Sequence, residues 1–208
     1  MSSIAVLTGD LIGSTRVASA RAFRGRMNEL LNLIAKKYGG HTHVYRGDGF
    51  QIVLAQNVNA FQVALLFRFG LIAKSPSRSE RWDARLAIAF GAGSLASKSE
   101  NGAVFVESGR VLDAMKKEHL AVAANSEIRQ LAYGAATRYT DTAINRLSAK
   151  EAEVLFYYFL DHESHQSIAN KLHKQRATVT QALLRADYSL LDHYVQDMDA
   201  LTRLLGHE

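Results

Sequence analysis

The chain opens with IAVLTGDLIGST at residues 4–15 and returns to the same pattern with VYRGDGFQIVL at residues 44–54. In each stretch an apolar, strand-like run meets an aspartate with glycine beside it, Asp10 in the first and Asp48 in the second. A carboxylate at a strand end can hold Mg²⁺, and neighbouring glycines let backbone N–H groups approach phosphate oxygens. Each aspartate alone is an ordinary turn residue, but the two stretches together predict a phosphate or metal site.

Outward from these stretches, the first 146 residues alternate between strand-like and helix-like runs. The expected order is a strand at 4–8, a helix at 22–38, a hairpin of 41–46 and 50–55, a helix at 60–73, a strand at 85–90, a helix at 104–117 and a strand at 120–124. This β-α-β-β-α-β order predicts an α+β fold, a ferredoxin-like or palm-type sheet with helices on one face.

The tail from Leu147 onward differs, because glycine nearly vanishes and helical periodicity dominates. Ser148 followed by Glu151 is a capping-box pattern and predicts the start of a helix. We therefore expect two domains: a palm domain over residues 1–143 and an all-α domain over residues 144–208.

A helix-turn-helix pattern lies inside this tail. QSIANKL at residues 166–172 places the small Ala169 at a helix crossing, and HKQRATVTQALLRA follows at residues 173–186. Val179 and Leu183 would anchor the second helix, whose other face is polar. Short polar side chains and glutamine suit base edges, and basic side chains suit phosphates. The DNA-binding candidates are Lys174, Arg176, Thr178, Thr180, Gln181 and Arg185.

Charge is distributed unevenly along the 208 residues, whose formal net charge is +5. The tail from Leu147 carries six basic and nine acidic residues, whereas the preceding part carries nineteen basic and eleven acidic residues. A basic first part suits phosphate-bearing ligands or nucleic acid, and it equally suits an ordinary solvated surface. The acidic tail favours an alternative, a helical bundle that packs on the palm without touching DNA, because DNA binding draws on phosphate neutralisation.

Composition excludes several classes of protein. There is no run of about 18 uncharged apolar residues, so no membrane span is expected, and no signal peptide is apparent at the N-terminus. The absence of cysteine excludes a disulfide framework and a thiolate metal site. The histidines lack partners at metal-site spacing. We expect a cytoplasmic protein.

Three segments carry a resemblance to known families. GDLIGST at residues 9–15 resembles the first metal-binding segment of class III nucleotide cyclases. RGDGF at residues 46–50 resembles their hairpin segment and the signature turn of diguanylate cyclases, and the stretch from Asn101 to Arg110 resembles their later helix. The first two-thirds of the chain most resembles the SatD family, which has a similar Gly-Asp…Gly-Ser start and Gly-Asp-x-Phe-Gln turn. The tail resembles the helix-turn-helix of bacterial regulators, with a lead-in like that of response-regulator output domains.

The cyclase resemblance implies a palm in which Asp10 and Asp48 hold Mg²⁺ or Mn²⁺ and act on a nucleotide. The nucleotide-binding candidates are Leu11, Ile12, Gly13, Ser14, Thr15, Arg46 and Arg110. Two positions depart from the cyclases. Val44 stands where they have a base-selecting lysine, and Val106 stands where they have a transition-state asparagine.

We therefore expect a bacterial regulator, a homodimer whose palm binds a nucleotide with Mg²⁺ and whose tail reads DNA. Nucleotide binding would alter the domain or subunit arrangement and so the affinity for DNA. The alternative is an enzyme, a metal-dependent nucleotidyl transferase or cyclase that uses Asp10 and Asp48. A third possibility is a non-catalytic interaction protein with a decayed palm.

Overall fold

The computed structural model describes residues 3–15, 17–45, 47–55, 58–93, 102–124 and 126–205. Arg46, one of the nucleotide-binding candidates, lies outside these residues. The elements are β1 (Ser3–Leu11), α1 (Ala20–Tyr38), β2 (His41–Tyr45), β3 (Gly49–Ala55), α2 (Ala60–Ile72), β4 (Ala84–Ala92), α3 (Ala103–Ala114), β5 (Leu120–Val122), α4 (Glu127–Arg146), α5 (Ala149–Asp161), α6 (His165–Lys171), α7 (Arg176–Arg185) and α8 (Tyr188–Leu205).

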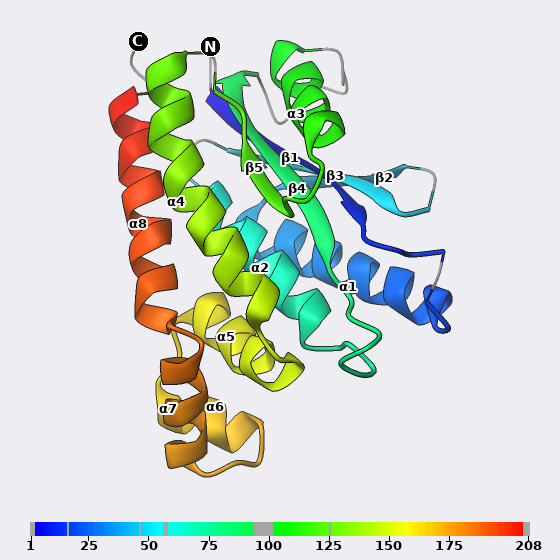
Figure 1. Ribbon diagram of the computed structural model, residues 1–208, viewed down its shortest axis with the longest axis vertical. Coiled ribbons are helices and arrows are strands. Elements are labelled where there is room, and N and C mark those ends of the chain that lie inside the picture. The colour runs from blue at the N-terminus through cyan, green and yellow to red at the C-terminus, as the bar shows by residue number, and fades with distance from the viewer. Residues whose placement is uncertain are drawn as a thin grey trace.

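A sheet with the strand order β2-β3-β1-β4-β5 forms the centre of the first part (Figure 1). All of its pairs are antiparallel except β4 with β5. β1 lies between β3 and β4 because its run from Ile4 to Leu7 is apolar on both faces, and these residues are buried. This arrangement of β1-α1-β2-β3-α2-β4 is ferredoxin-like, so the predicted fold class is confirmed.

Helices cover both faces of the sheet. α1 and α2 pack on one face, where Phe23 and Met27 of α1 join the main apolar core. α3 covers the opposite face, where Val104 packs with Ile4 and Val6 of β1. The expectation of helices on one face therefore holds for α1 and α2 and is wrong for α3, which covers the other face. None of the described helices combines the length and apolar composition needed to cross a membrane.

α2 joins the palm to the tail, and it is buried along nearly its whole length. The ring of Phe69 on α2 lies 5.5 Å from that of Phe159 on α5, and the ring of Phe61 lies 5.8 Å from that of Tyr194 on α8. One apolar cluster therefore continues from the sheet into the tail. The predicted boundary at 143/144 falls within the last turn of α4, and the division into two domains stays a prediction.

A buried arginine ties α2, β4 and α4 together. Arg68 of α2 is fully buried; its Nε and Nη2 donate to the two carboxylate oxygens of Asp83 at 2.9 and 2.8 Å. Its Nη1 donates to Asp141 at 2.7 Å, and its Nη2 also donates to Asn145 at 2.7 Å, both on α4. Burial alone would raise the pKa of Asp83, but the paired guanidinium overrides it and holds that pKa well below the usual range.

Candidate functional site

The sheet brings the two predicted aspartates to neighbouring strand ends. Asp10 lies near the end of β1 and pairs in register with Gly49, the first residue of β3. Asp48 immediately precedes that glycine, in the turn of the β2–β3 hairpin, and its carbonyl oxygen accepts from the N–H of Leu11 at 3.1 Å. The backbones of the two segments therefore lie side by side, as predicted.

The carboxylate of Asp10 already has a cationic partner. Arg85 of β4 lies directly across from Asp10 in the sheet register. Its Nε donates to Oδ1 of Asp10 at 2.9 Å, and its Nη2 donates to Oδ2 at 2.5 Å. These hydrogen bonds raise the pKa of Arg85. Such a bidentate pair occupies both carboxylate oxygens in one plane.

Asp48 is held from the other side by the loop after β1. Ser14 is buried, and its Oγ donates to Oδ2 of Asp48 at 2.7 Å. Gly13 before it has φ +67°, a left-handed conformation that glycine adopts without strain. The loop therefore positions Asp48 through a neutral hydroxyl, whereas Asp10 is neutralised by a charge.

Only part of the predicted nucleotide-binding loop is free to receive a ligand. The N–H of Leu11 donates to Asp48, and that of Ile12 donates to the carbonyl of Asp83 at 3.0 Å. Within the described residues, the N–H groups of Gly13, Ser14 and Thr15 have no backbone partner. A phosphate could therefore use the second half of this loop, while the first half holds the hairpin and β4 in place.

Arg110 is not brought to the two aspartates by any described hydrogen bond or ion pair. It lies on α3 with its side chain 73% exposed, and its Nη1 contacts Glu107 at 3.4 Å, one turn earlier on the same helix. An exposed pair of this kind contributes little to stability, so Arg110 remains available at the surface of α3.

The described residues do not fit a preformed metal centre at Asp10 and Asp48. They contain no group of three or more histidine or acidic side chains able to hold an ion together. Two carboxylates alone could hold Mg²⁺ with water and phosphate ligands, but both oxygens of Asp10 are already committed to Arg85. Mg²⁺ or Mn²⁺ at this pair stays a prediction, and it would require Arg85 to leave Asp10.

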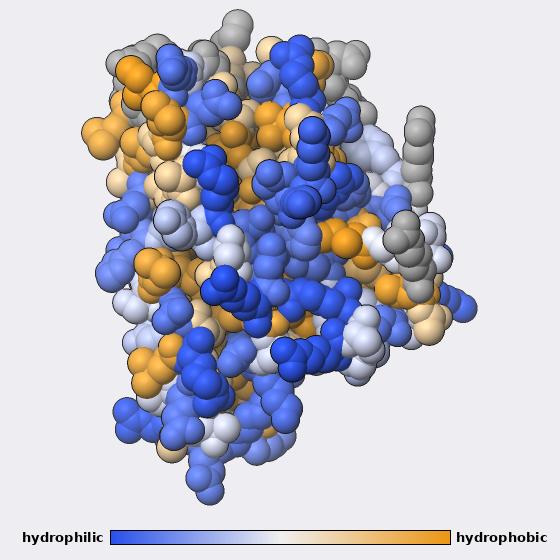
Figure 2. All heavy atoms as spheres, in the orientation of Figure 1, coloured by the Kyte–Doolittle hydropathy of each residue, from blue (hydrophilic) through white to orange (hydrophobic). Residues whose placement is uncertain are grey.

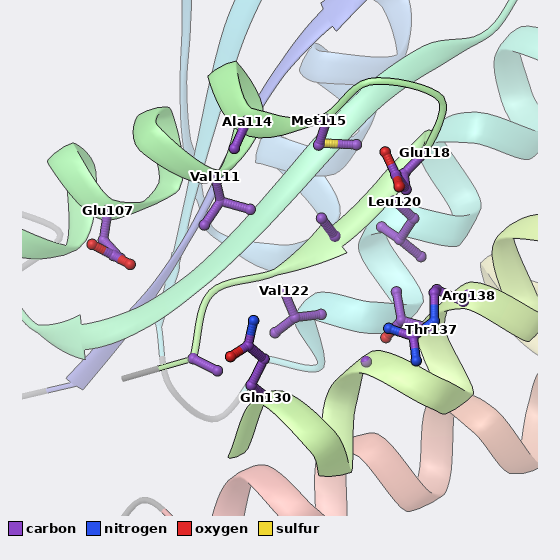
Figure 3. Close-up of a pocket in the computed structure, with 13 residues that line it drawn as sticks. Glu107, Val111, Ala114, Met115, Glu118, Leu120, Val122, Gln130, Thr137 and Arg138 are labelled. Carbon is purple, nitrogen blue, oxygen red and sulfur yellow. The ribbon is translucent and has the colours of Figure 1, made fainter. Parts of the chain in front are cut away.

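A separate hollow of about 390 Å³ lies between α3, β5 and α4 (Figure 3). Val111 and Leu120 contribute apolar surface. Glu107 comes from α3, Glu118 from the segment between α3 and β5, and Arg138 from α4. None of the nucleotide-binding candidates that the structure describes lines it. The predicted loop and the hollow are thus different places on the palm.

The tail forms the expected helix-turn-helix from α6 and α7. Ile168 and Ala169 of α6 pack with Val179 and Leu183 of α7, and all four are fully buried. His173 in the turn has φ 51°, and the following N–H donates to the carbonyl of Ala169 at 2.9 Å. The small Ala169 lets the two helices approach closely at this crossing, as its position in the sequence indicated.

One face of α7 is open. Arg176, Thr178, Gln181 and Arg185 are exposed, and the last three recur at helical spacing along one side. Thr180 is different: it is half-buried, and a hydrogen bond joins its Oγ1 to Nδ1 of His165 at 2.9 Å. Thr180 therefore stabilises the contact between α6 and α7, and its hydroxyl is engaged inside the protein.

Acidic side chains of α5 and its C-terminal loop face the basic residues of the motif. Lys174 contacts Glu153 at 3.1 Å, and Arg185 contacts Glu151 at 3.4 Å. Lys171 pairs with Glu163. Arg176 has no ion-pair partner in the part of the chain that the structure describes. Acidic residues of the tail thus form ion pairs with basic side chains that would bind phosphate.

The sequence pattern did not identify Arg85. It also did not identify the acidic residues that pair with the basic residues of the helix-turn-helix, Glu151, Glu153 and Glu163. Arg85 is a charged residue at the start of an otherwise apolar strand, ARLAIAFGA, and this contrast was the available signal. Its partner could not be named without the register between β1 and β4.

Comparison with known proteins supports the helix-turn-helix. Residues 137–186 match the family model described as Sigma-70, region 4. The match begins in the middle of α4, includes α5, α6 and α7, and ends just after α7. The tail therefore contains a helix-turn-helix of the sigma-70 region 4 type. None of the curated proteins matches this sequence, and the SatD resemblance stays a prediction.

Solved structures similar to this chain include three nucleotide cyclases. A bacterial light-regulated adenylyl cyclase has TM-score 0.43 and 11% identity, over 58% of this chain and 75% of that one. The dimeric guanylyl cyclase domain of the RhoGC fusion protein from the aquatic fungus Blastocladiella emersonii has TM-score 0.38 and 19% identity, over 55% and 75%. The catalytic core of a rhodopsin-guanylyl cyclase with converted specificity, in complex with ATPαS, has the same score and identity, over 55% and 73%.

Proposed function

We propose that this protein is a regulator that reads duplex DNA through α7. The observation that carries the proposal is the open polar face of α7, presented by a helix-turn-helix in a segment that matches sigma-70 region 4. The second helix of such a motif enters the major groove, where its N-terminal half reaches base edges. Thr178 and Gln181 would read bases, and Arg176 would contact phosphate.

The proposal predicts that Gln181→Ala weakens binding to the preferred duplex by about tenfold or more, because one bidentate base contact contributes about 1–3 kcal/mol. The preferred duplex would be selected from a random library with the full-length chain. Affinities would then be measured by fluorescence anisotropy at fixed salt, for the selected duplex and for a scrambled one.

Two further variants decide between base reading and general attraction. Arg176→Ala should weaken binding to both duplexes, since a phosphate contact carries no sequence information. Gln196→Ala, an exposed glutamine on α8 that bonds Asp192, is the matched control and should change neither affinity. If Gln181→Ala and Gln196→Ala behave alike while the wild-type chain prefers no duplex, the tail is an internal helical bundle and the proposal is wrong.

We propose that the DNA-reading form is a homodimer, as helix-turn-helix proteins that read two half-sites are. Apolar residues gather where the start of α4 meets the end of α8, at the upper left of Figure 2. There Ile128 is 73%, Leu131 69% and Leu204 75% exposed. A hydrogen bond of 3.1 Å between the hydroxyls of Tyr133 and Thr202 holds these two helix ends together. This patch suits a second copy of the chain.

The dimer proposal predicts that Ile128→Glu shifts the mass in solution from two chains toward one, because it would place a charge at the centre of a desolvated contact. Light scattering after size-exclusion chromatography measures the mass. Val106→Glu on α3, at an apolar position that is 56% exposed, is the matched control. A dimer that survives Ile128→Glu and is lost in Val106→Glu would place the interface on α3 instead.

A nucleotide as the controlling signal is also a proposal. It is supported by the N–H groups of Gly13, Ser14 and Thr15 after β1, which have no backbone partner among the residues that the structure describes. The same loop is connected to the tail, because Ile12 donates to the carbonyl of Asp83, whose side chain holds Arg68. Arg68 in turn holds Asp141 on α4, the helix in which the matched region begins. A phosphate on this loop would thus act on the helix that leads to the DNA-reading motif.

A further inference from the structure

The side chain of Arg85 is partly exposed, yet hydrogen bonds hold its guanidinium in place. Its guanidinium makes two hydrogen bonds to Asp10, and Nη1 adds a third, to the carbonyl of Met115, at 3.3 Å. The side chains of Arg85 and Asp10 are 33% and 30% exposed. The guanidinium therefore binds both the Asp10 carboxylate and the Met115 carbonyl, and the pair is only partly exposed.

The backbones of β1 and β4 approach each other closely at this point, with no room for a side chain at Gly9. A Cβ added to Gly9 would lie 2.5 Å from the carbonyl oxygen of Arg85 and 2.6 Å from the ring of Phe50. Only glycine therefore permits the close approach that sets Asp10 opposite Arg85. The pairing of these two side chains is built into the register of the sheet.

We infer that Arg85 is the resident cation of the palm site and occupies the place at Asp10 that a divalent metal would need. Both oxygens of Asp10 accept hydrogen bonds from the guanidinium, and a metal would have to displace it. Asp48, with one oxygen bound by Ser14, offers a single carboxylate, which is too few charged ligands for tight Mg²⁺ or Mn²⁺ binding. This role of Arg85 is independent of DNA reading by the tail.

Binding of Mn²⁺ to the full-length protein tests this inference, with free Mn²⁺ followed by electron paramagnetic resonance. The wild-type chain should leave Mn²⁺ free, and Arg85→Gln should gain one site. We expect a gain in affinity of about tenfold or more, the size by which one adjacent arginine alters the equilibria of a carboxylate. Asp10→Asn added to Arg85→Gln should abolish the gain. Arg78→Gln, an exposed arginine in the loop before β4, removes the same charge elsewhere and should gain nothing.

Two results would overturn the inference. One is that the wild-type chain binds Mn²⁺ at a site that Asp10→Asn abolishes, because Asp10 would then bind the metal with Arg85 still present. The other is a folded Arg85→Gln chain that binds no more Mn²⁺ than the Arg78→Gln control. If Arg85→Gln does not fold, Arg85→Lys serves in its place: lysine keeps the charge but cannot form the bidentate pair, so a smaller gain that still depends on Asp10 is expected.

Discussion

Arg68→Met is expected to lower the free energy of unfolding by about 3–5 kcal/mol, because it removes the cation from a buried ionic group. Asp141 would keep no ion-pair partner among the described residues, and Asp83 would keep only the longer contacts with Arg81 at 3.7 Å and His119 at 3.4 Å. Arg68 is fully buried and is the cation that holds both Asp83 and Asp141. Methionine fills a similar space without a charge, so the loss would come from the stranded carboxylates and not from a cavity. Urea unfolding at neutral pH, extrapolated to water, measures the change.

The pH dependence of the same variant separates this mechanism from simple loss of packing. In the wild-type protein Arg68 holds the pKa of Asp83 below its unfolded value, so acidification removes stability. In Arg68→Met, burial without the guanidinium would raise that pKa, so stability is present at low pH and lost as pH rises. The difference between the two chains should therefore shrink from neutral pH toward about pH 4. A difference that is constant with pH would contradict the mechanism.

The order of strands and helices was readable from local pattern. The apolar run of β1, the Gly47-Asp48-Gly49 turn and the capping box at Ser148 each mark an element through neighbours in sequence. The capping box is present in the structure, where Ser148 and Glu151 bond reciprocally. These features depend on short-range geometry, which is why the fold class and the helix-turn-helix followed from the chain alone.

The partners of the charged residues were not readable in this way. Arg85 meets Asp10 across 75 residues, and Arg68 meets Asp141 across 73. The first pair depends on the register between β1 and β4, and the second depends on where α4 packs. Neither can be read from residues that are neighbours in the sequence. The same holds for Glu153, whose contact with Lys174 joins α5 to the turn of the motif. Helical periodicity correctly predicts that Gln181 is exposed, whereas Thr180, predicted to bind DNA beside it, is half-buried against His165, a contact that periodicity does not reveal.

Phe159→Ala in the tail is expected to lower the stability of the whole chain by about 3–5 kcal/mol, as truncation of a buried phenylalanine does. Phe159 of α5 is fully buried against Phe69 of α2. Beside them a Cβ on Gly70 would lie 3.0 Å from the ring of Phe156, so α2 and α5 are in tight contact. Since the core is continuous across this contact, palm and tail should unfold in one transition.

The single tryptophan makes this coupling measurable, because Trp82 stacks on Phe23 of the palm with ring centroids 5.0 Å apart. Its fluorescence reports the palm, whereas circular dichroism reports helices of both parts. Phe159→Ala should shift both urea transitions equally, although the substitution lies in the tail. Leu184→Ala, at a position of the tail that is 60% exposed, should shift neither. An unshifted fluorescence transition, with an earlier second transition in circular dichroism, would mean that the tail unfolds independently and that α2 does not transmit stability between the two parts.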